Sequence, residues 1–154
     1  PIPQENYLVV DGYHHDYGTQ PGDAFSMTEN TDGSTTFQWS ANQAEIDNKR
    51  TWSVTLRAGA SLTQDQNFTL GTQAVPVSEL GERLASIRVL DINTPEACSY
   101  PVSLNGELNL RYFERPNGNS IVMYFDDIQF IRICDNEQQE WGNLSGQMVY
   151  LQQN

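Results

Sequence analysis

The sequence predicts an all-β domain on three observations. Apolar and polar residues alternate in several short segments, which is the period of a strand with one buried face. Clusters of Gly, Asn, Asp and Pro separate these segments at spacings of roughly 8–12 residues or somewhat more. No segment carries an apolar stripe at helical spacing. We therefore expect one antiparallel two-sheet β-sandwich, jelly-roll-like or immunoglobulin-like, with about 8–10 strands and little helix, spanning residues 1–154.

The clearest strand pattern surrounds Trp52, Val54 and Leu56, which alternate with polar residues and should point into the core. Short helical turns compete only at 41–50 and 78–84, where the apolar residues do not form a stripe. The other expected strands are Tyr7–Val10, Thr35–Ser40, Phe68–Leu70, Val75–Val77, Ala85–Val89 and Met148–Leu151. Expected turns include Thr31–Ser34 and Gly142–Asn143.

A long hairpin is expected between residues 107 and 134. Asn117-Gly118 predicts a two-residue turn there, because a type I′ turn needs positive φ at both central positions. This turn would place apolar pairs on one face of the hairpin. The expected pairs are Tyr112 with Met123 and Leu110 with Phe125.

Strict alternation after Phe125 would turn Asp127 toward the core. A bulge at Asp126-Asp127 avoids this, because one extra residue returns Ile128 and Phe130 to the apolar face. Residues 125–130 also resemble the aromatic-Asp-Asp-Ile strand found late in jelly-roll carbohydrate-binding modules. That resemblance covers only this strand, and the chain continues further beyond it than in that family, so no membership follows. A bulged strand with two exposed or capped carboxylates is the alternative.

The chain is strongly acidic. Eight basic and twenty acidic residues give a formal net charge of -12, which repels phosphate backbones and anionic lipid headgroups. No apolar run approaches the ~18 residues that a membrane-spanning helix needs. Nucleic acid and membranes are therefore poor partner candidates. Solubility, divalent cations or a basic protein partner would each explain the charge.

Cys98 and Cys134 predict one structural disulfide, because neither lies in a Cys-x-x-Cys motif or beside a histidine. The alternative is two unrelated buried thiols in a cytosolic protein. The sequence begins at Pro1 and not at Met. A removed secretory or lipoprotein signal would explain this, and so would trimming of a longer protein for expression. We expect an extracellular, periplasmic or cell-surface location. The oligomeric state stays open.

The best local candidate for a ligand-binding site is a segment between Gly12 and Gly18 that combines aromatic, imidazole and carboxylate groups. We expect it to be a loop, because loops on rigid sheets often carry binding residues. An ordinary polar surface loop is the alternative. The candidate residues are Tyr13, His14, His15, Asp16 and Tyr17.

Calcium is the one ion that the sequence suggests. Asp91, Asn93 and Glu96, or the neighbourhood of Asp23, could supply oxygen ligands, although the spacing of a helix-loop-helix calcium loop is missing. No other cofactor is expected. The sequence contains no nucleophile, zinc-peptidase or phosphate-loop motif, so we do not expect an enzyme. A carboxylate pair for glycoside hydrolysis is the remaining enzymatic alternative.

These observations favour a non-catalytic extracytoplasmic binding or cell-surface domain, either a secreted protein or a lipoprotein, with a glycan or a protein as its ligand. The alternative, from a different class, is an acidic inhibitor or immunity-type protein that neutralises a basic enzyme or toxin.

Overall fold

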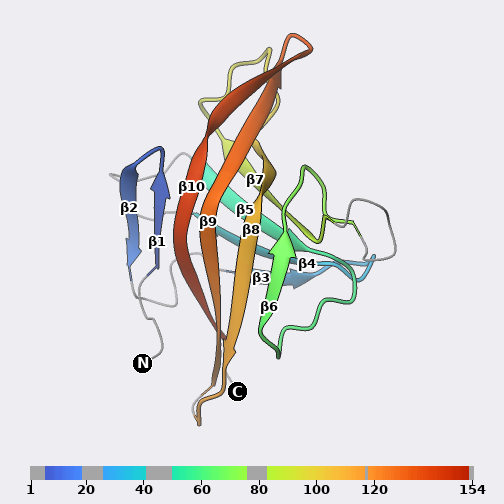
Figure 1. Ribbon diagram of the computed structural model, residues 1–154, viewed down its shortest axis with the longest axis vertical. Coiled ribbons are helices and arrows are strands. Elements are labelled where there is room, and N and C mark those ends of the chain that lie inside the picture. Colours follow the sequence, from blue (N-terminus) through green and yellow to red (C-terminus); the bar gives the residue numbers. More distant parts are fainter. Residues whose placement is uncertain (1–5, 19–25, 41–49, 76–82, 117, 153–154) are drawn as a thin grey trace.

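The computed structural model describes residues 6–18, 26–40, 50–75, 83–116 and 118–152, which form an all-β structure (Figure 1). These ranges contain no helix, and so none long and apolar enough to cross a membrane. Of the helical turns expected at 41–50 and 78–84, residues 41–49 and 78–82 lie outside the described residues, Arg50 begins β5, and residues 83–84 are not helical. The strands are β1 (Asn6–Val10), β2 (Tyr13–Gly18), β3 (Ser26–Glu29), β4 (Thr35–Ser40), β5 (Arg50–Leu56), β6 (Gln66–Thr69), β7 (Ala85–Asp91), β8 (Val102–Phe113), β9 (Asn119–Cys134) and β10 (Glu137–Gln152).

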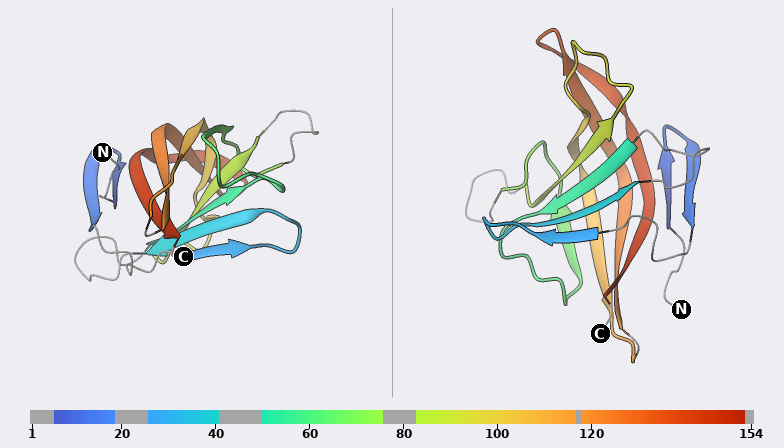
Figure 2. Two further views of the ribbon diagram at one scale, coloured as in Figure 1. Left: turned by 90° about the horizontal axis from the view of Figure 1, so that it is seen from below. Right: turned by 180° about the vertical axis from the view of Figure 1, so that it is seen from behind.

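One hydrogen-bonded path connects the described strands in the order β2-β1-β10-β9-β8-β7-β5-β4-β3, and β6 also pairs with β8. The sheet curls into a half-barrel. Seen from below, β9 and β10 arch over one side while β3 and β4 lie on the other (Figure 2, left). The all-β prediction is confirmed. The predicted division into two separate sheets is not confirmed, because β7 pairs with β8 and continues the path.

Aromatic side chains fill the space between the two sides of the curl. The rings of Trp52 and Phe130 meet edge to face with centroids 6.0 Å apart, and those of Trp39 and Phe125 lie 6.1 Å apart. Because offset and edge-to-face aromatic pairs bury large apolar areas, these contacts hold β4 and β5 against β9. The prediction that Trp52, Val54 and Leu56 face the core is confirmed, since all three are fully buried.

The hairpin between β8 and β9 forms, but its predicted register is wrong by two residues. Gly118 has positive φ (131°) as expected, but Phe113 at the end of β8 pairs with Ser120 of β9, so the connection is longer than a two-residue turn. A shift of two keeps the same residues on the same face, because side chains alternate with period 2. The observed pairs are Tyr112 with Ile121, Leu110 with Met123 and Leu108 with Phe125.

The bulge predicted at Asp126-Asp127 is confirmed. Between its pairs with β8 at Asp126 and Gln129, β9 contains one residue more than its partner, and Asp127 has a φ of 45°. The extra residue leaves both aspartates exposed and returns Ile128 to the buried face. A bulge was therefore correctly predicted from the fact that strict alternation would have turned the charged Asp127 side chain into the core.

The turn expected at 31–34 is also confirmed. The N–H of Gly33 donates to the carbonyl of Asn30 at 3.0 Å. The carboxylate of Asp32 accepts hydrogen bonds from the hydroxyl of Ser34 at 2.6 Å and from its N–H at 2.9 Å. These two hydrogen bonds, the hydroxyl first, lower the pKa of Asp32 because they favour the charged carboxylate.

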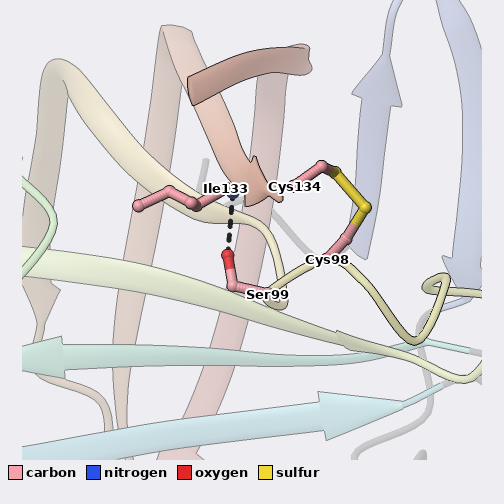
Figure 3. Close-up of a disulfide and its surroundings, with 4 residues drawn as sticks. All are labelled: Cys98, Ser99, Ile133 and Cys134. Carbon is pink, nitrogen blue, oxygen red and sulfur yellow. Dashed lines mark hydrogen bonds between the residues drawn. A yellow bond between two sulfur atoms is a disulfide. The ribbon is translucent and has the colours of Figure 1, made fainter. Parts of the chain in front are cut away.

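The disulfide between Cys98 and Cys134 is present (Figure 3). Next to it, the hydroxyl of Ser99 accepts a hydrogen bond from the N–H of Ile133 at 2.9 Å, and the N–H of Ser99 donates to the carbonyl of Ile133 at 2.7 Å. The bond and these contacts attach the segment after β7 to the end of the β9–β10 hairpin. A disulfide is consistent with an oxidising, extracytoplasmic location.

A buried hydroxyl and a backbone hydrogen bond, from the N–H of Val89 to the carbonyl of Pro101 at 2.9 Å, support the joint between β7 and β8. The two strands share only the pair of Arg88 with Val102. The fully buried Ser103 hydroxyl accepts a hydrogen bond from the N–H of Ile87 at 2.9 Å and donates to the carbonyl of Gly71 at 2.7 Å. The Ser103 hydroxyl thus provides hydrogen-bond partners for the Ile87 N–H and the Gly71 carbonyl, which form no hydrogen bond to the backbone of β8.

Replacing Ser103 with Ala should lower the free energy of unfolding by about 2 kcal/mol, because a buried N–H and a buried carbonyl would lose their partner. Urea denaturation followed by tryptophan fluorescence would measure the loss. Ser86→Ala, on β7, is the matched control and should change stability by less than about 0.5 kcal/mol. Equal effects of the two substitutions would contradict the role assigned to Ser103.

Candidate functional site

The predicted ligand-binding segment is not a loop. Asp11 and Gly12 have φ of 51° and 84°, which are the two positive values of a type I′ turn, so the chain enters β2 directly at Tyr13. The segment pairs along β1 from Val10 opposite Tyr13 onward. It therefore forms an outermost strand of the path, and the expectation of a loop is wrong.

Two of the predicted residues have described side chains. Tyr13 is 72% exposed, and His14 stacks on Tyr7 with ring centroids 5.0 Å apart and an interplanar angle of 14°. His14 thus covers one face of the Tyr7 ring. The side chains of His15, Asp16 and Tyr17 lie outside the described residues. The role of this segment in binding stays a prediction.

The structure contains a pocket elsewhere, beside β10 where β1 ends. Its volume is about 400 Å³, within the range of roughly 300–1,000 Å³ typical of small-ligand sites. It is built from β8, β9, β10 and the turn that follows β1. The described residues that line it are Asp11, Leu104, Gln129, Phe130, Ile131, Gln138, Glu140, Trp141, Gly142 and Asn143.

Two irregular positions in the strands shape this pocket. The pairing of β10 with β9 shifts between Glu140 and Gly142, and that of β8 with β9 shifts between Ser103 and Asn105. Each shift inserts one unpaired residue, Trp141 in the first case and Leu104 in the second. Because bulges bend the strand and redirect side chains, these two bulges shape a depression at this place in the sheet.

Asp11 is held at the rim of the pocket. Its carboxylate Oδ1 accepts a hydrogen bond from the N–H of Asn143 at 2.9 Å, and its own N–H donates to the carbonyl of Asn143 at 3.0 Å. Gly142 makes room for this carboxylate, because a Cβ there would lie 2.7 Å from Asp11 Oδ2. The turn expected at Gly142-Asn143 is wrong, since both residues lie within β10.

Trp141 forms part of the pocket wall and is partly buried against the core. Its ring lies 5.7 Å from that of Phe130 and 6.2 Å from that of Trp52, measured between centroids. The guanidinium of Arg50 lies over the same ring at 5.0 Å. These contacts fix the ring as a support for the site, and Arg50 occupies a position that a stacking ligand would need.

Of the oxygen ligands expected for calcium, the Asp91 carboxylate makes other contacts. The carboxylate of Asp91 accepts hydrogen bonds from Arg50 Nε at 3.2 Å and from the N–H of Asn93 at 2.8 Å. The guanidinium thus supplies the positive charge beside this carboxylate. No group of three or more metal-ligating side chains occurs in the described part of the chain. Asp23 lies outside it.

The polar side chains of the pocket suit a ligand with hydrogen-bond donors. Three amides (Gln129, Gln138 and Asn143) and two carboxylates (Asp11 and Glu140) line it. Of these five side chains, only that of Asp11 hydrogen-bonds to another described residue. The described lining contains no cationic side chain, so the pocket favours neutral or positively charged ligands over anions.

Sequence reasoning missed this pocket, because its residues come from four separate parts of the chain. One local signal was present: Asp11-Gly12 is as strong a two-residue hairpin signal as Asn-Gly, and it would have placed β1 and β2 side by side. Comparison of the chain with protein-family models, with curated proteins and with solved structures finds no match.

Proposed function

We propose that the chain is a non-catalytic binding domain that holds a glycan or a protein ligand in the pocket beside β10. The observation that supports this proposal is a group of side-chain amides and carboxylates that line the pocket and make few hydrogen bonds to other described residues. Polar groups left free in a concave site are the groups that fix a ligand's orientation. The predicted residues Tyr13 and His14, on the neighbouring hairpin, are a second proposed contact region.

An extracytoplasmic location, as a secreted protein or a lipoprotein, is part of the proposal. The disulfide supports it, because such bonds persist mainly in oxidising compartments. The lack of a recognisable nucleophile-base motif in the sequence supports a binding role over a catalytic one.

Glycan and peptide arrays probed with the native protein and with two variants test the proposal. Gln129→Arg places a long cationic side chain in the pocket, and we expect it to lose the ligands that the native protein binds. Gln38→Arg makes the same change on the exposed side of β4 and should bind like the native protein. Ligands that bind both variants equally would exclude the pocket as their site.

The second candidate function is an acidic inhibitor that neutralises a basic enzyme or toxin. The observation that favours it is that both charged groups of the described pocket lining are carboxylates, on a chain with a net charge of -12. Electrostatic steering should then make association with a basic enzyme fast at low salt and markedly slower at high salt. Association rates that do not change with salt would exclude this function.

A further inference from the structure

The upper part of β10 has an unpaired edge directly beside the pocket. β1 pairs with β10 only from Leu144 to Gln147, and its turn reaches as far as Asn143. Above that point, residues 137–140 and 142 pair with β9 on one side, and no described strand pairs with their other side. Figures 1 and 2 show β10 rising well beyond the end of the β1–β2 hairpin.

The turn between β9 and β10 determines which backbone groups face this free edge. Asp135 and Asn136 have φ of 50° and 66°, so they form a two-residue type I′ turn, and Cys134 and Glu137 are its hydrogen-bonded pair. Hydrogen-bonded and non-hydrogen-bonded pairs alternate in an antiparallel ladder. The N–H and C=O groups of Gln138 and Glu140 therefore point away from β9, toward the free edge.

The same two residues contribute side chains to the pocket. A strand added along this edge would hydrogen-bond to the backbone of Gln138 and Glu140 and would lie beside the pocket that their side chains line. Such strand addition gains affinity from main-chain hydrogen bonds and specificity from pockets that accept alternate side chains. The edge and the pocket thus have the relative placement that a strand-like ligand needs.

Charge decides which strand this edge would accept. A second copy of the chain would bring its own charge of -12 and its own glutamates to the edge, which disfavours pairing between copies. A basic segment is attracted instead. The apolar side chains of Leu104 and Ile131 can cover the aliphatic stem of a lysine or arginine, while Asp11 and Glu140 face its charged end.

We propose that the free edge of β10 and the adjoining pocket bind an extended basic peptide segment of a protein partner, which adds as a strand and places a lysine or arginine side chain in the pocket. This inference rests on the proposed function and names its ligand as a protein and not a glycan.

The test uses three end-blocked peptides: Thr-Val-Arg-Val-Thr, the same peptide with Gln in place of Arg, and the Arg peptide with N-methylated backbone. We expect the Arg peptide to bind about tenfold more tightly than the Gln peptide, and the N-methylated peptide not to bind. Hydrogen exchange of the Gln138 and Glu140 amides should slow about tenfold when the Arg peptide is saturating.

Two protein variants localise the effect. Glu140→Gln should weaken binding of the Arg peptide by about tenfold, whereas Glu137→Gln removes the same charge outside the pocket lining and should leave binding within about twofold. Equal binding of the Arg and Gln peptides, or unchanged exchange at Gln138 and Glu140, would overturn the inference. If the native protein binds a neutral glycan and the Gln129→Arg variant does not, the peptide inference fails and the proposed function is supported. If Gln129→Arg loses no ligand, both proposals fail.

Discussion

Replacing Trp52 with Ala should lower the free energy of unfolding by about 3–5 kcal/mol, the largest effect that we expect from one substitution in this chain. The side chain is fully buried and meets Phe130 on β9 and Trp141 on β10. Alanine would lose both edge-to-face contacts and leave a cavity between the two sides of the curl, which the surrounding strands can only partly fill.

Chemical denaturation monitored by far-UV circular dichroism would measure this loss without depending on tryptophan signals. Ser53→Ala, at the next position on β5 and therefore on the opposite face, is the control and should cost less than about 0.5 kcal/mol. A loss below about 1 kcal/mol for Trp52→Ala would mean that the contacts across the curl contribute little to stability.

The strands around Trp52 and in 35–40 could be predicted because each of them buries mainly one face. The alternation around Trp52 and in 35–40 leaves only one arrangement that keeps polar residues in water. The bulge at Asp127 could be predicted for the same reason. Without it, a charged side chain would enter the core, at a cost far above that of one unpaired backbone position.

The number of sheets could not be predicted, because it depends on contacts between distant segments. The contact of β7 with β8 involves one residue pair, the backbone hydrogen bond from Val89 to Pro101, and the hydroxyl of Ser103, which bridges the backbone at Ile87 and Gly71. A serine among apolar strand residues carries no local sign of such a role. The alternation of side chains is the same in a curled sheet and in a sandwich.

The candidate binding segment was wrongly expected to be a loop, because its composition was given more weight than the turn chemistry before it. The aromatic and histidine residues from Tyr13 to Tyr17 suggested a loop, although Asp11-Gly12 before them is a hairpin turn. The pocket depends on Trp141 and Leu104 being extra residues in their strands, which only the register of the neighbouring strands reveals. Its polar residues look like ordinary surface positions in the sequence.

Replacing both Cys98 and Cys134 with Ala should lower the free energy of unfolding by about 3–4 kcal/mol. The bond joins residues 36 positions apart, so it removes many conformations from the unfolded chain. Its loss should therefore also make the unfolded state more expanded and raise the dependence of the unfolding free energy on denaturant.

The native protein in reductant separates the covalent bond from the packing of the two side chains. Intact mass should first show the unreduced protein about 2 Da lighter than the dithiol form, as one disulfide requires. If the crosslink carries the stability, the reduced protein and the double variant should unfold within about 1 kcal/mol of each other. A reduced protein as stable as the oxidised one would show that the two hydrogen bonds between Ser99 and Ile133, one of them to the Ser99 hydroxyl, already hold this end of the hairpin. The disulfide would then contribute little to stability, because the two segments that it joins would stay close together in the unfolded ensemble even without it.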